Sequence, residues 1–317
     1  MTASASAPDR GPASGRASAS GRGSAPERVL QRLDWTVVRR LDGLLQGDYR
    51  SLFRGNGVDF ADLRPYEYGD DVRHIDWNVT ARMDVPYIRE YLEDREITAW
   101  FLLDLSPSVD FGTVDAERLK RSVLVDVVTT LARVLTRHGN RVGAIFYGAG
   151  VERTIPARGG RVQVLRLIND LQRHPRHRAA PFTDLSLLLE AGLRWIKGRS
   201  LVFVISDFIS SPGWERALQP LTVRHEVVAI RLYDRREREL PDVGPMLMDD
   251  AETGEQLYID THDRRFRKRF AEANERREAE LAAAFRRAGV DAVDLATDED
   301  LLAAIVRMAA RRKRVKH

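Results

Sequence analysis

Residues 99–108, Ala99-Trp-Phe-Leu-Leu-Asp-Leu-Ser-Pro-Ser108, join a short apolar run to a polar turn. Five consecutive apolar residues are typical of a strand that is buried on both faces. Asp104, Ser106 and Ser108 follow this run directly, and Pro107 ends the strand. In open α/β sheets, ligands bind at the carboxyl ends of the strands. These three side chains are therefore predicted to lie at the functional edge of a sheet.

The rest of the chain after this stretch alternates between helix and strand patterns. Apolar residues between Leu119 and Leu135 recur at helical spacing, and the pattern stops at His138-Gly139. The sequence also predicts strands at 141–147, 151–155, 201–205, 226–232 and 291–295, helices at 160–173, 183–197, 262–288 and after Thr297-Asp-Glu-Asp300, and a hairpin across 246–259. This alternation predicts an α/β fold with a mostly parallel sheet and helices on both faces.

The residues before the sheet divide into two parts. Residues 1–25 consist almost entirely of Ser, Ala, Gly, Pro and Arg, so we expect a disordered leader. Order is predicted to begin at the capping box Ser24-Ala-Pro-Glu27, with a helix that ends near Gly43 or Gly47. We therefore expect a leader at 1–25, an N-terminal helix and polar segment at 26–97, and an α/β domain with a C-terminal extension at 98–317.

Composition excludes several functional classes. The 317 residues include no cysteine, which excludes disulfides, thiolate metal ligands and a cysteine nucleophile and fits a cytoplasmic location. No apolar run reaches the ~18 residues of a membrane helix. The 51 basic residues, of which only five are lysines, face 47 acidic ones, so we expect a mixed surface that binds no nucleic acid. A phosphate-binding G-x-x-x-x-G-K-[ST] loop is also absent from the sequence, which argues against a P-loop ATPase.

Two further oxygen-bearing residues join the candidate site. Asp207 follows the strand at 201–205 at the same relative position that Asp104 has to its own strand, and Thr183 precedes a helix. Two adjacent strands at a switch point bring such carboxylates together. Carboxylates and hydroxyls suit a hard divalent cation such as Mg²⁺. A simpler interpretation stays open, in which Thr183 caps a helix and the two aspartates cap turns.

The order Asp104-x-Ser106-x-Ser108, Thr183, Asp207 resembles the metal-ion-dependent adhesion site of von Willebrand factor A domains. The preceding segment resembles the signature of the family called domain of unknown function 58, and the resemblance covers roughly residues 28–235. The motifs that carry it are Arg54-Gly-Asn-Gly57, Phe60-Ala-Asp-Leu-Arg-Pro-Tyr66, Glu67-Tyr-Gly-Asp-Asp-Val-Arg73 and Ile75-Asp-Trp77.

This resemblance implies both a cofactor and a partner. It assigns Mg²⁺ or Mn²⁺ to five residues, namely Asp104, Ser106, Ser108, Thr183 and Asp207. It implies a MoxR-type AAA ATPase as the partner and work in assembling or activating other protein complexes. Many relatives carry membrane helices, for which this sequence offers no candidate.

The segment at 54–77 also has two interpretations. Its charged residues are numerous enough to form ion pairs under Tyr66, Tyr68 and Trp77, which favours a structural network. The alternative is a docking face for the partner. The basic stretch Arg311-Arg-Lys-Arg314 is predicted to be the solvated end of a helix.

The sequence is compatible with two functions. The first is a non-catalytic binding module, in which a partner's Glu or Asp completes the coordination of the metal. The second is a metal-dependent hydrolase such as a nuclease. Hydrolases of that kind need several convergent carboxylates or a general base, and the sequence offers only two aspartates beside hydroxyls, so we favour the binding module.

Overall fold

The computed structural model of the chain describes residues 24–38, 40–41, 63–83, 85–89, 96–110, 118–177, 182–249 and 256–315. Several of the sequence predictions lie wholly or partly outside the described residues. They are the leader up to residue 23, the end of the first helix near Gly43 or Gly47, the motif Arg54-Gly-Asn-Gly57, the first three residues of the motif at 60–66, and the hairpin turn at 252–254.

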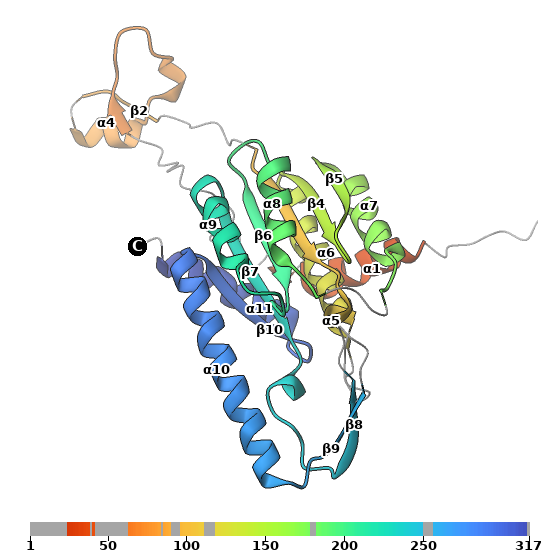
Figure 1. Cartoon of the computed structure of the whole chain (residues 1–317). Coiled ribbons are helices and arrows are strands. Elements are labelled where there is room, and N and C mark those ends of the chain that lie inside the picture. The colour runs from red at the N-terminus through yellow and green to blue at the C-terminus, as the bar shows by residue number, and fades with distance from the viewer. Residues whose placement is uncertain are drawn as a thin grey trace, which may run out of the picture.

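The core of the molecule is a six-stranded sheet with the order β10-β7-β6-β3-β4-β5 (Figure 1). Every neighbouring pair is parallel except β4 and β5, so the predicted mostly parallel α/β sheet is confirmed. The strands are β3 (Thr98–Asp104), β4 (Arg141–Tyr147), β5 (Val151–Arg158), β6 (Leu201–Ser206), β7 (Glu226–Tyr233) and β10 (Asp291–Ala296). All six overlap a strand that the sequence predicts.

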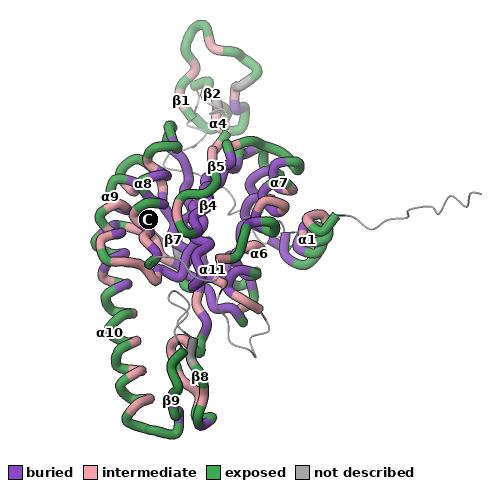
Figure 2. The backbone as a smooth tube through the Cα atoms, turned by 45° about the vertical axis from the view of Figure 1, so that its right-hand side comes forward, coloured by how far each residue is buried: buried purple, intermediate pink, exposed green. Residues whose placement is uncertain are grey.

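Helices cover both faces of this sheet (Figures 1 and 2). Alternate residues of a strand point to opposite faces, so Phe101 and Leu103 enter one hydrophobic cluster while Trp100 and Leu102 enter the other. The first cluster includes residues of α1 (Ala25–Leu33), α6 (Lys120–Arg137), α7 (Gly160–Arg173) and α11 (Leu301–Val315). The second includes residues of α8 (Leu185–Trp195), α9 (Trp214–Arg224) and α10 (Arg264–Ala288).

The N-terminal helix begins as predicted but continues in a different form. The side chain of Ser24 accepts a hydrogen bond from the Glu27 backbone, and the Glu27 carboxylate accepts one from the Ser24 backbone, which confirms the capping box. After Leu33 the chain forms the π-helical segment η1 (Asp34–Val38) instead of continuing as an α-helix. Val37, Val38 and Leu41 are nevertheless buried, so the wider turn keeps the apolar side in the core.

A small unit precedes the sheet in sequence. It contains β1 (Leu63–Pro65), η2 (Val72–His74), α4 (Trp77–Met83) and β2 (Tyr87–Arg89), and β1 pairs with β2 in antiparallel fashion. The predicted ion pairing is present, because Arg64 donates two hydrogen bonds to Asp70 at 2.8 and 2.7 Å. The predicted aromatic cover is wrong for Tyr68 and Trp77, which are exposed, whereas Tyr66 is half-buried. A two-stranded unit with three-residue strands has too little interior to bury them.

The C-terminal extension adds an arm at the carboxyl edge of the sheet. It leaves the sheet through η3 (Arg235–Glu237), and the predicted hairpin is confirmed as β8 (Pro245–Asp249) paired with β9 (Gln256–Asp260). In Figure 1 the hairpin and the first turns of α10 lie below the sheet, on the side of α5 (Pro107–Asp110). Gly289, in the left-handed region at φ 66°, ends α10 as predicted. None of the helices in the described part of the chain is both long and apolar enough to cross a membrane.

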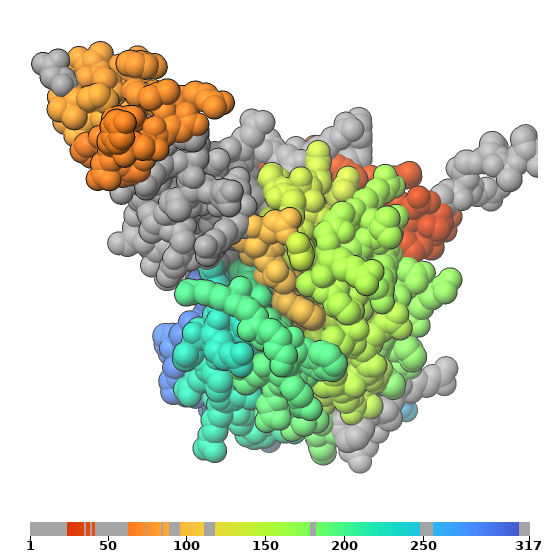
Figure 3. Space-filling view, turned by 90° about the horizontal axis from the view of Figure 1, so that it is seen from above, coloured from red at the N-terminus to blue at the C-terminus, as the bar shows by residue number. Residues whose placement is uncertain are grey.

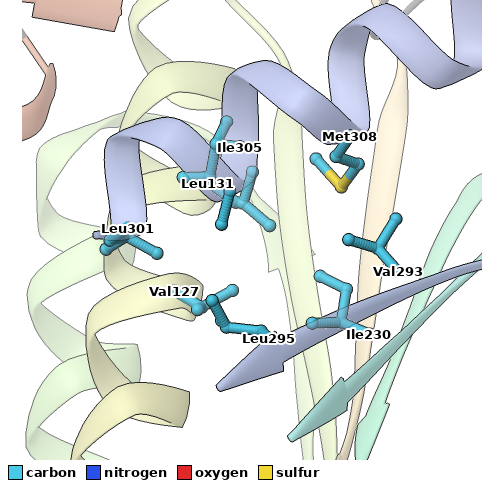
Figure 4. Close-up of a pocket in the computed structure, with 9 residues that line it drawn as sticks. Val127, Leu131, Ile230, Val293, Leu295, Leu301, Ile305 and Met308 are labelled. Carbon is cyan, nitrogen blue, oxygen red and sulfur yellow. The ribbon is translucent and has the colours of Figure 1, made fainter. Parts of the chain in front are cut away.

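A small apolar pocket lies between α11 and the sheet (Figure 4). Its walls come from α6, α11, β7 and β10, and all the residues that line it are apolar. They are Val127, Leu131, Ile230, Val293, Leu295, Leu301, Ala304, Ile305 and Met308. Such a lining has no polar group that would orient a ligand, so we interpret the pocket as a packing gap under the last helix.

Protonation of buried histidine gives a testable pH dependence. His225 lies between α9 and β7 and is only 4% exposed. Burial, aided by the charge of Arg224, lowers the pKa of His225. The unfolded chain therefore takes up a proton near pH 6.5 that the folded chain resists, so the free energy of unfolding falls as the pH drops from about 7 to 5. One such group contributes at most about 1.4 kcal/mol per pH unit.

Thermal unfolding of the wild type and of His225→Leu between pH 5 and 8 tests this prediction. We expect a shallower loss of stability at acid pH in the variant. Equal slopes in the two proteins would show that His225 is protonated as readily in the folded chain as in the unfolded one.

Candidate functional site

The candidate site lies where the chain reverses its direction across the sheet. From β3 the chain proceeds to β4 on one side, and it later returns to β6 on the other side, which makes the β3–β6 boundary a switch point. Figure 3, which views the opposite edge of the sheet, shows the light orange residues of this part of the chain between lime and green segments of the sheet domain. Leu103 pairs with Ile205, so Asp104 and Ser206 come next at the carboxyl edge.

Asp104 is the most enclosed acidic group of the site. Its side chain is fully buried, and its two oxygens accept hydrogen bonds from the Ser106 backbone at 3.0 Å and from the Ser206 hydroxyl at 2.6 Å. Burial, followed by the negative charge of Asp207, raises the pKa of Asp104 to about 7. A cation at this edge would offset both the loss of hydration of the Asp104 carboxylate and its repulsion by Asp207.

The predicted hydroxyls gather beside this carboxylate. Ser106 and Ser108 lie on either side of Pro107 at the start of α5, both are buried, and their Oγ atoms are 3.1 Å apart. The backbone amide of Ser106 donates to Asp104, so the turn itself fixes one serine next to the carboxylate. Two hydroxyl oxygens and one carboxylate thus come from three alternate positions of a single turn.

Thr183 precedes α8 in sequence, and hydrogen bonds to the loop that follows β6 hold it at the same edge. Its carbonyl oxygen accepts hydrogen bonds from the Ser211 backbone at 2.8 Å and from the Ser210 hydroxyl at 3.1 Å. The interpretation of Thr183 as a helix cap is wrong, because Asp184 caps α8 by accepting a hydrogen bond from the Ser186 backbone. Thr183 is buried as well.

Asp207 completes the set of five residues. One of its oxygens accepts a hydrogen bond from the Ile209 backbone at 3.0 Å, and the other accepts one from the ammonium of Lys120 at 2.9 Å. The next residue, Phe208, has a φ of 58°, which is rare for a residue with a side chain. The turn-cap interpretation therefore holds for one oxygen of Asp104 and one of Asp207, while their second oxygens bind other side chains.

The structure adds Lys120, which the sequence did not single out as part of the site. Its side chain is fully buried at the first position of α6, and its ammonium also donates to Glu237 of η3 at 2.6 Å. Burial works to lower the pKa of Lys120, but the Asp207 and Glu237 carboxylates outweigh it, so the pKa is raised. A charged ammonium therefore lies at the edge that is predicted to hold a metal.

The donor set is compatible with a divalent cation of the hard class. Among the described residues, no three His, Cys, Asp or Glu side chains are arranged to hold a metal ion. A metal at this edge would therefore depend on the Ser106 and Ser108 hydroxyls as well as the two aspartates. Hydroxyl and carboxylate oxygens are ligands that Mg²⁺ accepts, and a carboxylate oxygen that receives one hydrogen bond keeps a second lone pair.

Comparison with known proteins identifies the family. Residues 62–280 match the family described as "Protein of unknown function DUF58". The chain belongs to the DUF58 family. This DUF58 chain is 37% identical over 288 residues to an uncharacterized protein of Mycobacterium tuberculosis, with 90% of this chain and 89% of the relative covered. An uncharacterized protein of Mycobacterium avium is 36% identical over 160 residues, which span 50% of this chain and 94% of the relative.

Solved structures with a similar chain arrangement were also found for this DUF58 protein. One is the conserved hypothetical protein BatB from Bacteroides thetaiotaomicron, with a TM-score of 0.43 and 12% identity over 69% of this chain and 99% of that one. Another is an aerotolerance-related membrane protein from Bacteroides fragilis, with a TM-score of 0.44, 12% identity and the same coverage. Likeness at this level of identity concerns the fold alone.

Proposed function

We propose that this DUF58 protein is a non-catalytic, metal-dependent protein-interaction module. The observation that carries the proposal is the convergence of Asp104, Ser106, Ser108 and Asp207 at one switch point of the sheet. A buried carboxylate such as Asp104, whose pKa is raised by burial and by the negative charge of Asp207, is a costly arrangement unless a cation is bound. A bound Mg²⁺ or Mn²⁺ would supply a positive centre for an incoming carboxylate.

The protein side chains have distinct roles in this proposal. Asp104, Ser106, Ser108, Thr183 and Asp207 hold the metal, and Ser206 fixes Asp104 through its hydroxyl. A Glu or Asp of the partner completes the coordination. The five residues are buried, so the partner's carboxylate reaches the metal only with a rearrangement of this edge.

The partner class that we propose is a MoxR-type AAA ATPase, with which the protein assembles or activates other protein complexes. The family resemblance supplies this class, and the oxygen-rich site supplies the chemistry of contact. Membership of the DUF58 family supports the resemblance over residues 62–280.

Single hydroxyl deletions test the proposal directly. Ser106→Ala and Thr183→Val each remove one ligand with little change in volume. We expect each to weaken the complex with the ATPase by about tenfold, which corresponds to about 1.4 kcal/mol, one lost ligand contact. Surface plasmon resonance on the full chain in Mg²⁺ measures this affinity, with Ser186→Ala on α8 as the matched hydroxyl control.

The variants decide this experiment better than chelation does, because the ATPase needs Mg²⁺ for its own nucleotide. Equal affinity for Ser106→Ala, Thr183→Val and the wild type would contradict a metal bridge. It would move the docking surface to the small unit at 63–89, where Arg64→Glu is the next variant. Cleavage of nucleic acid by the purified protein in Mn²⁺, lost in Asp104→Ala, would instead favour a hydrolase.

A further inference from the structure

Lys120 is a buried cation that contacts the metal site but is not one of its five predicted ligands. It lies at the start of α6, outside the strands and loops that carry those residues, yet its ammonium is held between Asp207 at 2.9 Å and Glu237 at 2.6 Å. An ammonium is expensive to take out of water unless its charge is closely matched. Its two carboxylate partners come from different segments of the chain, Asp207 from the loop after β6 and Glu237 from η3.

Glu237 is held in place independently of Lys120. Its other carboxylate oxygen accepts a hydrogen bond from the Asp234 backbone at 3.3 Å, within the capping box of η3. Its carbonyl oxygen accepts one from the Asn274 side chain of α10 at 2.9 Å. Glu237 therefore stays available to the ammonium whether or not Asp207 is occupied by another cation.

The local charges balance in two different ways. Without a metal, Lys120 is shared between Asp207 and Glu237. With a divalent cation, the two aspartates match its two charges, and Lys120 with Glu237 forms a neutral pair. Another buried cation near Asp207 is Arg231, and it is already paired with Glu278 of α10.

We propose that Lys120 is an internal counter-ion that occupies Asp207 in the metal-free protein and passes to Glu237 when a divalent cation binds. The inference rests on the proposed metal site and adds a residue that regulates it. Lys120 competes with the metal for Asp207, and Glu237 reduces the cost of releasing that carboxylate. This exchange stabilises the metal-free fold and makes binding of the metal reversible.

Substitutions of the two partners of this exchange have opposite expected effects. Lys120→Met removes the competitor, so the dissociation constant for Mg²⁺ falls by about tenfold or more. Glu237→Gln removes the second acceptor, so Lys120 stays on Asp207 and the dissociation constant rises. Isothermal titration of the full chain with Mg²⁺ and with Mn²⁺, after removal of bound metal, measures both.

Arg231→Met is the matched control for the removal of positive charge. It deletes another buried cation near Asp207, one that binds Glu278 and not the site. Direct competition predicts an affinity within about threefold of the wild type. An equal gain in Arg231→Met and Lys120→Met would overturn the proposal, because a general change of the local field would then explain both.

The outcomes separate this inference from the proposed function. Mg²⁺ binding to the wild type with an unchanged affinity in Lys120→Met would overturn the inference alone. Failure of Mg²⁺ and Mn²⁺ to bind either protein would overturn both. Should Lys120→Met fail to fold without metal, its recovery of native circular dichroism in Mg²⁺ supports the inference, and failure to recover in saturating Mg²⁺ opposes it.

Discussion

Asp104→Asn is expected to abolish the rise in melting temperature that Mg²⁺ causes in the wild type. A ligand that binds only the folded chain adds about 2.7 kcal/mol at a concentration 100 times its dissociation constant, and this contribution depends on the Asp104 carboxylate. Without metal, the same variant is expected to be more stable than the wild type at pH 8. Because the pKa of Asp104 is raised from 3.8 to about 7 in the folded chain, ionisation of this carboxyl lowers the free energy of unfolding progressively from about pH 4 and fully above pH 7, whereas asparagine has no such charge.

Differential scanning calorimetry of both proteins at pH 8, with and without Mg²⁺, measures these two effects together. The wild type should be the more stable protein in Mg²⁺ and the less stable one in chelator. A Mg²⁺ shift that is retained in Asp104→Asn would show that the metal binds elsewhere. Asp110→Asn is a suitable control, since Asp110 follows the same turn but pairs with Arg121.

Phe203→Ala is expected to lower the free energy of unfolding by about 3–5 kcal/mol. Phe203 of β6 is fully buried, pairs in register with Phe101 of β3, and stacks on it with ring centroids 5.3 Å apart. The pairing of these two strands also brings Asp207 beside Asp104. The variant therefore tests the packing on which the site depends.

Urea denaturation with a double-mutant cycle that includes Phe101→Ala measures this contact. We expect a coupling energy of about 0.5–1.5 kcal/mol for the stacked rings. Leu187→Ala, on the exposed side of α8, is the control and should change stability by less than about 0.5 kcal/mol. Additive effects of Phe101→Ala and Phe203→Ala would contradict the adjacency of β3 and β6.

The fold could be predicted from the sequence because its strands carry a strong and local signal. The runs at 99–103 and 201–205 are continuously apolar, as a strand covered on both faces requires, and the structure places them side by side. Asp104 directly follows the first run and Asp207 follows the second run after Ser206, so their meeting at one edge follows from the topology. Helix α9 was not predicted, because it follows Ser211-Pro212-Gly213 and contains Pro220, all residues that favour loops.

The contacts around the site were harder to predict because they join residues that are far apart in sequence. Lys120 and Glu237 are separated by 117 positions, and no periodicity links them. One weak signal was present, since Lys120 is one of only five lysines in a chain where arginine supplies most of the positive charge. A compact ammonium fits a closed space between two carboxylates better than the broad guanidinium does. Ser206 was missed because it ends a strand as an ordinary polar residue.

Anomalous diffraction from crystals of the full chain grown in Mn²⁺ tests the metal site most directly. We predict a single strong anomalous peak at the carboxyl edge of the sheet, in contact with the side-chain oxygens of Ser106, Ser108 and either aspartate. The ammonium of Lys120 should then contact Glu237 and no longer Asp207. A map without a peak among these residues, in crystals that still show the Lys120–Asp207 ion pair, would contradict a metal-dependent site in this protein.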